Sequence, residues 1–510
     1  MTRSVRWVTA CLIAALAFTA SCQRNSGRPE NTLVIALESS PTVLDPRLST
    51  DATAAKIEGL IFNGLVKRND DFTLSPDLAE SWENPSPTRY IFHLRRNVKF
   101  HDGTTFTSRD VKAEFDFISN PASKSFLRAA FSGVQSVETP DEATVIFDLK
   151  EPSAPFLDTM TMAIVPAGAG ADFAEKPAGT GPFKFVEFKR DEILTLVRND
   201  NHFDGAPKIG RLEFKIMPDE TVRTLSLESG EAQVIMNPIT PDLLPRFREN
   251  KNLSVVTAPG SNYSYIGFNM EDRLTANPAV RKAIAHAIDR ESVIRHILKG
   301  LARPASGPFY PAMAFHENDV AKFDYDPDRA MRMLDEAGFA DPDGPGPMTR
   351  FTLRYSTSQN ELRKRIAEVF QWQLAKVGIG LDIRSYEWGA FYADIKKGNF
   401  QMFSLTWVGI SDPDILHYMF HSSSLPPDGA NRGRYVNKTL DGLLENGRVT
   451  FGDERRQVYS RAQKMIAEDL PYISLWHPEN VAVTGRRIKN FSLGPDEGIK
   501  SLKDAWIEGQ

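Results

Sequence analysis

The sequence LAESWENPSPTRYIFHLRRNVKFHDGTTFTSRDV, residues 78–111, is the stretch that decides the fold. Apolar side chains recur at every second position from Tyr90 to Leu94, which is the period of a strand with one buried face. His101-Asp102-Gly103 then supplies turn chemistry, because Gly tolerates positive φ and Asp can accept hydrogen bonds from the backbone ahead of it. Ser108 or Asp110 is expected to cap the helix that follows. The stretch therefore predicts a strand, a turn and a helix start.

The whole chain is long and mildly acidic. Its 510 residues are too many for one ordinary core, and the length predicts roughly three domain-sized units. The composition, with 41% apolar and 25% charged residues, is typical of a folded globular protein. A formal net charge of −5, without a basic run that contains aromatic residues, argues against a nucleic-acid partner.

Strand and helix patterns alternate on either side of this stretch. Residues 33–37 (LVIAL) form a continuous apolar run, as expected for a strand buried on both faces. Asn277-Pro278 and Asp326-Pro327 predict helix starts, because Asn and Asp cap helices and Pro suits the first helical position. Residues 353–383 give a strand, a helix and a strand, which implies a parallel pair. The class is predicted as α/β.

The order of the motifs resembles a known family. LAESW, then YIFHLRRNVKFHDGTTFTSRDV, and later GTGPF at residues 179–183 are similar to the signature of family 5 extracellular solute-binding proteins, the peptide- and nickel-binding components of ATP-driven importers. The resemblance covers nearly all of the chain. It implies a two-lobed periplasmic-binding-protein fold, the Venus flytrap, with a small α/β subdomain inserted in lobe 1. The expected division is signal peptide 1–21, tether 22–31, lobe 1 in three parts (32–66, 178–268 and 479–510), inserted subdomain 67–177 and lobe 2 269–478.

The N-terminus predicts export. Two positive charges precede an apolar run at residues 7–20, which is shorter than the roughly 20 residues of a spanning helix. The small residues Ala20 and Ser21 stand before Cys22, which resembles a bacterial lipoprotein signal, although Thr19 departs from the usual Leu. We expect lipidation of Cys22 and a membrane-anchored protein on the periplasmic side of the cell envelope. An ordinary secretory signal, cleaved nearby, is the alternative.

The sequence predicts binding rather than catalysis. It contains no Gly-x-Ser-x-Gly, His-Glu-x-x-His, Cys-x-x-Cys or dinucleotide motif, and no cofactor is expected. His417 and His421 are spaced for one helix face, but no third metal ligand accompanies them. The family resemblance implies a monomer that captures peptides and delivers them to the permease and ATPase subunits of an ABC importer. A metal chelate, a sugar or an opine is the alternative solute, and an exported hydrolase or scaffold is a third reading.

The resemblance also implies candidate ligand contacts. Trp407 opens a Trp-x-x-Asp-like segment that faces the ligand in the family, although a core role for this Trp is the alternative. Arg432 and Arg434 can bind a carboxylate or form surface ion pairs. Trp388 can instead serve only packing, and Ser39 and Ser40 can instead form an ordinary turn. The full expected set is Glu38, Ser39, Ser40, Tyr263, Tyr265, Asn269, Trp388, Trp407, Gly409, Ile410, Asp412, Arg432 and Arg434.

Two family positions are altered in this sequence. The position that resembles the aspartate pairing with a peptide's α-ammonium is Ile410, while Asp412, two residues on, can bind ligand or cap the next helix. Dipeptide-binding relatives place an arginine for the carboxylate after the strand that begins at Leu353, where this chain reads Tyr355-Ser356-Thr357-Ser358. Free dipeptides are therefore expected to bind poorly, because a buried ammonium without a partner costs several kcal/mol.

Overall fold

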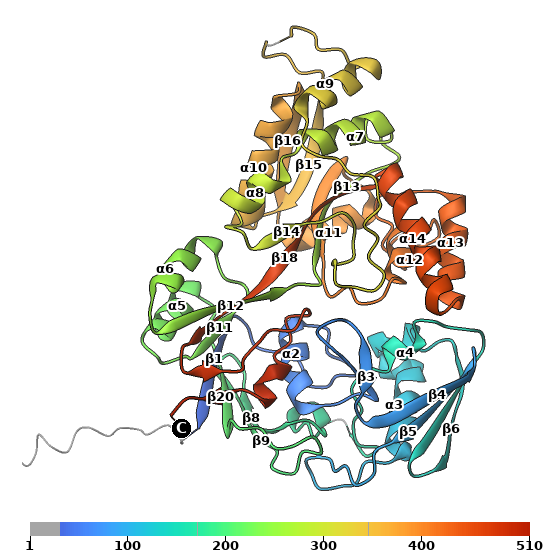
Figure 1. The fold of residues 1–510 in the computed structure, drawn as a ribbon, viewed down its shortest axis with the longest axis vertical. Coiled ribbons are helices and arrows are strands. Elements are labelled where there is room, and N and C mark those ends of the chain that lie inside the picture. Colours follow the sequence, from blue (N-terminus) through green and yellow to red (C-terminus); the bar gives the residue numbers. More distant parts are fainter. Residues whose placement is uncertain (1–30, 171, 345, 510) are drawn as a thin grey trace, which may run out of the picture.

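The computed structural model describes residues 31–170, 172–344 and 346–509, and these form two lobes, one above the other (Figure 1). Two segments of chain cross between the lobes. The first lies between β12 (Leu253–Pro259) and β13 (Tyr263–Phe268), and the second lies inside the long strand β18 (Tyr472–Gly485). The segments touch at Gly260, where an added Cβ would lie 2.3 Å from the carbonyl oxygen of Pro478.

Lobe 1 contains the half of the large sheet with the order β18-β11-β1-β10-β9-β8. Its strand β1 (Thr32–Leu37) is parallel to β10 (Arg211–Ile216) and β11 (Val234–Met236), and its side chains enter two hydrophobic clusters on opposite faces. The strand predicted at residues 33–37 and its double burial are confirmed. The other elements of this lobe are β8 (Phe183–Lys189), β9 (Ile193–Arg198), β19 (Ile488–Lys489), β20 (Trp506–Ile507), α2 (Ala52–Ile61), α5 (Glu220–Glu228) and α6 (Leu244–Glu249), with short 3-10 turns at Phe173–Glu175, Pro241–Leu243 and Lys500–Lys503.

Residues 78–111 contribute the strands β4 and β5 to a separate four-stranded sheet, which has the order β4-β5-β7-β6. In β5 (Arg89–Leu94), Tyr90, Phe92 and Leu94 are buried, which confirms the predicted strand with one buried face. The helix α3 (Ser108–Ser119) packs on this sheet through Phe115, whose ring lies 4.6 Å from that of Phe147. The other elements are β2 (Val66–Arg68), β3 (Leu74–Pro76), β4 (Ala79–Ser86), β6 (Val134–Asp141), β7 (Thr144–Leu149), α4 (Phe156–Thr159) and 3-10 turns at Pro121–Ser123 and Phe126–Ala129.

The predicted cap of α3 was wrong by one residue. Thr107 is the N-cap, and Asp110 occupies the third helical position. The carboxylate of Asp110 accepts a hydrogen bond from the backbone N–H of Thr107 at 2.7 Å, as the acidic member of a capping box does. Both Thr107 and Ser108 have cap-forming side chains, so the residue type alone did not separate them.

Lobe 2 contains the half of the large sheet with the order β16-β15-β17-β13-β18. Strands β15 (Phe351–Ser358) and β16 (Ile379–Tyr386) are parallel and joined by α10 (Glu361–Ala375), which confirms the predicted β-α-β unit. The predicted helix starts are also confirmed, because Asn277 and Asp326 cap their helices and each is followed by Pro. The remaining elements are β14 (Ala302–Pro304), β17 (Met402–Trp407), α7 (Pro278–Ala287), α8 (Arg290–His296), α9 (Pro327–Glu336), α11 (Trp388–Lys397), α12 (Ile415–Phe420), α13 (Lys438–Val449) and α14 (Gly452–Asp469).

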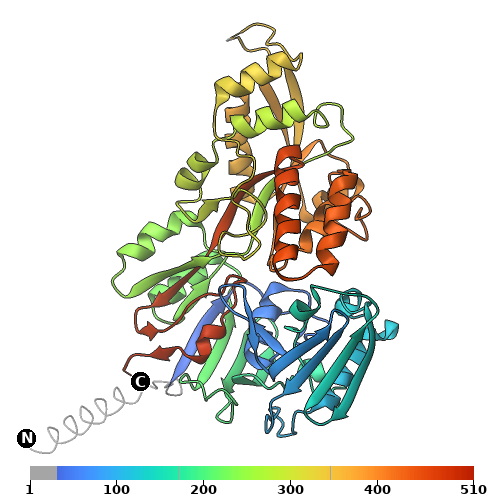
Figure 2. The same ribbon diagram turned by 45° about the vertical axis from the view of Figure 1, so that its right-hand side comes forward.

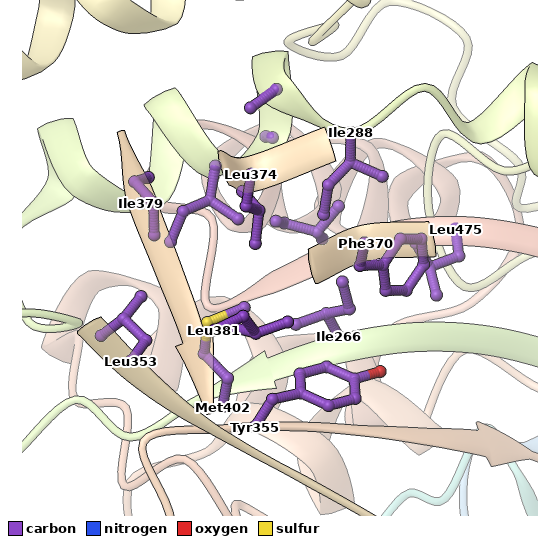
Figure 3. Packing of buried hydrophobic residues seen from close by; sticks show 14 of the residues in the cluster. Ile266, Ile288, Leu353, Tyr355, Phe370, Leu374, Ile379, Leu381, Met402 and Leu475 are labelled. Carbon is purple, nitrogen blue, oxygen red and sulfur yellow. The ribbon is translucent and has the colours of Figure 1, made fainter. Parts of the chain in front are cut away.

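The two faces of this half-sheet pack on different helices. One face buries Ile266, Tyr355, Leu381 and Met402 against α7 to α10, as Figure 3 shows around Phe370 and Leu374. The other face packs on α11 to α14. Helices α13 and α14 stand at the boundary with lobe 1, beside the small sheet (Figure 2). Within the described residues, none of the helices is long and apolar enough to span a membrane.

Candidate ligand-binding site

The carboxyl ends of parallel strands in both lobes point toward the chain crossings. In lobe 1, the end of β11 lies beside Ala482 of β18, just past the second crossing. In lobe 2, Trp407 at the end of β17 pairs with Tyr263, the first residue after the first crossing. Open α/β sheets bind ligands outside the carboxyl ends of their strands. The interlobe boundary is therefore the candidate site.

The lobe 1 edge offers hydroxyls and one carboxylate. Glu38 and Ser39 follow β1 and are exposed, and Ser40 is half-buried. The hydroxyl of Ser39 lies 3.3 Å from that of Thr53, and the hydroxyl of Ser40 accepts from the backbone N–H of Asp191 at 2.7 Å. These residues lie where the sequence placed them, at the end of the first strand.

The lobe 2 edge carries aromatic rings with a guanidinium between them. Trp388 is 53% exposed and stacks on Tyr392, one helical turn on, with ring centroids 5.6 Å apart. The Arg432 guanidinium lies 5.6 Å from the Tyr392 ring and 4.5 Å from the Trp407 ring. Trp407 in turn meets Tyr418 edge to face. This arrangement suits planar or apolar solute groups that also carry a polar end.

Arg432 is buried and is held by phenols. It donates to the Tyr265 hydroxyl at 3.0 Å and to the Tyr392 hydroxyl at 3.2 Å. Although burial opposes the charge, the surrounding tyrosines raise the Arg432 pKa above its usual value. The guanidinium is therefore a fixed positive charge at this site.

Ile410 and Asp412 have internal roles in the structure. Ile410 is 3% exposed and packs in the cluster under α12 to α14. Asp412 accepts two hydrogen bonds from Arg455, at 2.8 and 2.9 Å, and a third from the backbone N–H of Asp414. Gly409, between these residues and Trp407, is exposed with a φ of 67° and donates to Asn262 at the first crossing. The carboxylate of Asp412 is therefore bound within the protein itself.

Of the other expected residues, Tyr263 and Tyr265 are buried beneath the boundary edge, whereas Asn269 and Arg434 lie away from it. Tyr263 and Tyr265 are buried in the lobe 2 core, with the Tyr263 hydroxyl 2.7 Å from that of Ser474. Asn269 follows the far end of β13 and donates to the carbonyls of Gly398 and Phe400, at 3.1 and 3.0 Å. Arg434 pairs with Glu271 at 3.1 Å, which is the surface ion pair that the sequence left open.

His417 and His421 stack on one another with ring centroids 4.3 Å apart. Burial, with the nearby positive charge of Arg448, lowers the His417 pKa to about 4. His421 instead faces Glu445 at 3.2 Å and Ser423 at 2.7 Å. In the part of the chain that the structure describes, no cluster of three or more His, Cys, Asp or Glu could hold a metal ion.

Two residues that shape this site were missed from the sequence. Tyr392 stands four positions after Trp388, so helical spacing alone would have placed both on one face. Arg455 lies 43 positions from Asp412, and no local pattern connects them. The lipidation candidate Cys22 lies outside the described residues.

The lobes also touch on both sides of the crossings. On one side, Asp242 of lobe 1 accepts from Arg365 at 3.2 Å and lies 3.4 Å from Lys299, both in lobe 2. On the other side, the backbone N–H of Ala154, beside the small sheet, donates to the carbonyl of Arg448 in α13 at 2.8 Å. The described conformation is therefore one in which the lobes are in contact.

Comparison with known proteins shows the family of this chain. Residues 73–425 match the family described as bacterial extracellular solute-binding proteins, family 5. The oligopeptide-binding protein AppA of Bacillus subtilis is 30% identical over 96% of this chain and 94% of its own length. The dipeptide-binding protein of Escherichia coli is 28% identical over 91% of this chain and 92% of its own length.

Similar proteins of known structure superpose on more than nine-tenths of this chain. AppA of Bacillus subtilis in complex with a nonapeptide superposes with a TM-score of 0.76 at 28% identity, covering 93% of this chain and 98% of that one. NikZ of Campylobacter jejuni in complex with Ni(L-His) superposes with a TM-score of 0.79 at 26% identity, covering 94% of this chain and all 100% of that one. Proteins similar to this chain thus hold ligands as different as a nonapeptide and a nickel–histidine complex.

Proposed function

The chain belongs to the family 5 bacterial extracellular solute-binding proteins, and from this premise we propose that it captures peptides between its two lobes for an ABC importer. The observation that carries the proposal is the pair of sheet edges that face one another across two chain crossings. A hinge at such crossings lets the lobes close around a solute. The closed form would then engage the permease, with an ATPase on its far side.

Ligand binding without chemistry is the testable core of this proposal. A peptide that contacts both lobes should compact the protein and raise its melting temperature, because it binds only the native state. X-ray scattering and thermal unfolding with a peptide that calorimetry shows to bind would measure both effects. Scattering that stays identical with and without that peptide would contradict hinge closure, and turnover of the peptide by the pure protein would show an enzyme.

The substrate need not carry a free N-terminus. Ile410 is apolar and buried, and Asp412 is occupied by Arg455, so neither side chain is available to an α-ammonium. Longer peptides, N-blocked peptides or a non-peptide solute such as a metal chelate, sugar or opine then fit better than free dipeptides. Calorimetry with a dipeptide panel tests this: tight binding that disappears in Asp412→Asn would show that Asp412 exchanges Arg455 for ligand.

We also propose that the protein is a monomeric lipoprotein, tethered through Cys22 on the outer side of a membrane. A short apolar run followed by two small residues supports this assignment. Cys22→Ala should release the protein into the soluble envelope fraction, as cell fractionation would show. Unchanged membrane association of that variant would remove the lipid anchor from the proposal.

A further inference from the structure

Five arginines are buried as whole residues in the described part of the chain, and four of them have strong acceptors: Arg47, Arg223, Arg281 and Arg455. Arg47 and Arg455 form ion pairs with Asp45 and Asp412, and the other two donate to backbone carbonyls, such as those of Met217 and Thr275. Arg432 is the exception. Among the described residues no carboxylate pairs with it, and its hydrogen-bond partners are neutral phenol hydroxyls, those of Tyr265 and Tyr392 and, more weakly, that of Tyr472.

The surroundings of Arg432 hold donors that have no acceptor. A guanidinium has five N–H groups. Two of them donate to Tyr265 and Tyr392 and a third interacts with Tyr472, so the guanidinium still has N–H groups to offer a solute. The indole N–H of Trp407, whose ring lies under the guanidinium, is also buried without a hydrogen-bond partner in the described chain. Burial of a charge and of an unpaired donor is costly unless an acceptor is supplied from outside.

The position of this group allows a solute to supply that acceptor. Trp407 ends β17 at the boundary edge, and the next residue, Val408, is 72% exposed. Trp388, stacked on the Tyr392 ring that Arg432 also contacts, is 53% exposed. A flat, acceptor-only group entering between these residues from the interlobe boundary would meet N–H donors and an aromatic floor.

We propose that Arg432 and the Trp407 indole N–H form the binding site for a carboxylate of the solute, an inference that rests on the proposed function of solute capture. A carboxylate is planar and accepts two parallel N–H bonds from a guanidinium. In lobe 2 the corresponding site for an ammonium is closed, because Arg455 occupies Asp412. The solute class is therefore one with a free carboxylate, bound by lobe 2 at its negative end.

The test compares an acid with its amide. N-acetyl-trialanine and its C-terminal amide differ only in the terminal group that Arg432 would bind, a carboxylate with two acceptor oxygens in one and a neutral amide in the other. Calorimetry should show the wild type binding the acid at least tenfold more tightly than the amide. Arg432→Met should bind both with the affinity of the amide, and Arg432→Lys, which keeps the charge but not the planar fork, should fall between. Arg384→Met is the control, since Arg384 lies on β16 and pairs with Asp382, and it should keep the preference.

Other results would overturn the inference. If the wild type bound acid and amide equally, Arg432 would not be a carboxylate site, while peptide capture would stand. If neither peptide bound, a short blocked peptide would not be the solute, and native mass spectrometry of solute retained from the cells would decide the carboxylate site. An anionic solute present in the wild type and absent from Arg432→Met would support it; a neutral or cationic solute retained by both would overturn it. The Lys variant provides a readout even if the Met variant does not fold.

Discussion

Arg432 and Arg455 occupy similar surroundings in lobe 2 but have different partners. They are 7% and 6% exposed, and each guanidinium lies over aromatic rings. Arg455 has a carboxylate with two hydrogen bonds, and Arg432 has phenols. In a buried ion pair, each charge is neutralised by its partner inside the protein. A buried cation without a counter-charge can instead be neutralised by an anionic group of a solute. Under the proposed carboxylate site, this difference separates a structural arginine from a binding arginine within one lobe.

The largest effect is expected when the complete pair is broken. Arg455→Met would leave Asp412, whose side chain is 19% exposed, without its counter-ion. Loss of one partner of a buried pair costs about 3–5 kcal/mol in the free energy of unfolding. Urea unfolding would measure this. Arg456→Met is the matched control, because the neighbouring Arg456 side chain is 54% exposed, and a change of about 0.5 kcal/mol or less is expected there. Equal losses in both variants would contradict the contrast.

In lobe 1, the buried carboxylate of Glu114 lies between the paired and the unpaired case. Arg47 attracts it but forms its own ion pair with Asp45. Burial raises the pKa of Glu114 to about 8, despite the attraction of Arg47 and a weak hydrogen bond from the backbone of Val165. The unfolded chain loses this proton near the usual pKa of 4.5, so the contribution of Glu114 to stability is present below that pH and is lost as pH rises to about 8.

Glu114→Gln should therefore gain stability relative to the wild type as pH rises. The difference in unfolding free energy between pH 5 and pH 9 is expected to be on the order of 2–3 kcal/mol, since each pKa unit corresponds to about 1.4 kcal/mol and relaxation reduces the full value. Urea unfolding at both pH values measures it. Glu138→Gln, on the exposed side of β6, is the control. A pH-independent difference would show that Glu114 ionises normally.

The fold was predictable where the signals were local. The alternation at residues 90–94, the caps at Asn277 and Asp326 and the β-α-β unit of lobe 2 all came from patterns within about 30 residues, and the order of motifs gave the family. For Arg432 and Asp412 the sequence left two roles open each, and no local pattern decided between them. Tyr265 lies 167 positions from Arg432 and Tyr392 lies 40 positions away, so only the packed lobe shows that the arginine lacks an acid.

The substitution Arg432→Met should lower the free energy of unfolding less than Arg455→Met does. Arg432→Met loses the hydrogen bonds to the phenol hydroxyls but also removes a buried charge, and these contributions oppose one another. We expect a change of about 1 kcal/mol or less in the free energy of unfolding, measured in urea beside Arg455→Met. A loss as large as that of Arg455→Met would mean that Arg432 acts as structural support, like its neighbour.

The smallest effect on stability is expected at an exposed charge contact. Asp242 of lobe 1 there meets Arg365 and Lys299 of lobe 2. These side chains are between 39% and 47% exposed, so water and salt screen the pair and its removal should leave unfolding unchanged. The pair nevertheless joins two bodies that are expected to move apart. Asp242→Asn should therefore shift unliganded protein toward a more open form at low salt, seen as a larger radius of gyration in X-ray scattering. High salt should abolish the difference from the wild type, because it weakens the same contact in both. A difference that persists in high salt would assign the effect to packing at Asp242 rather than to its charge.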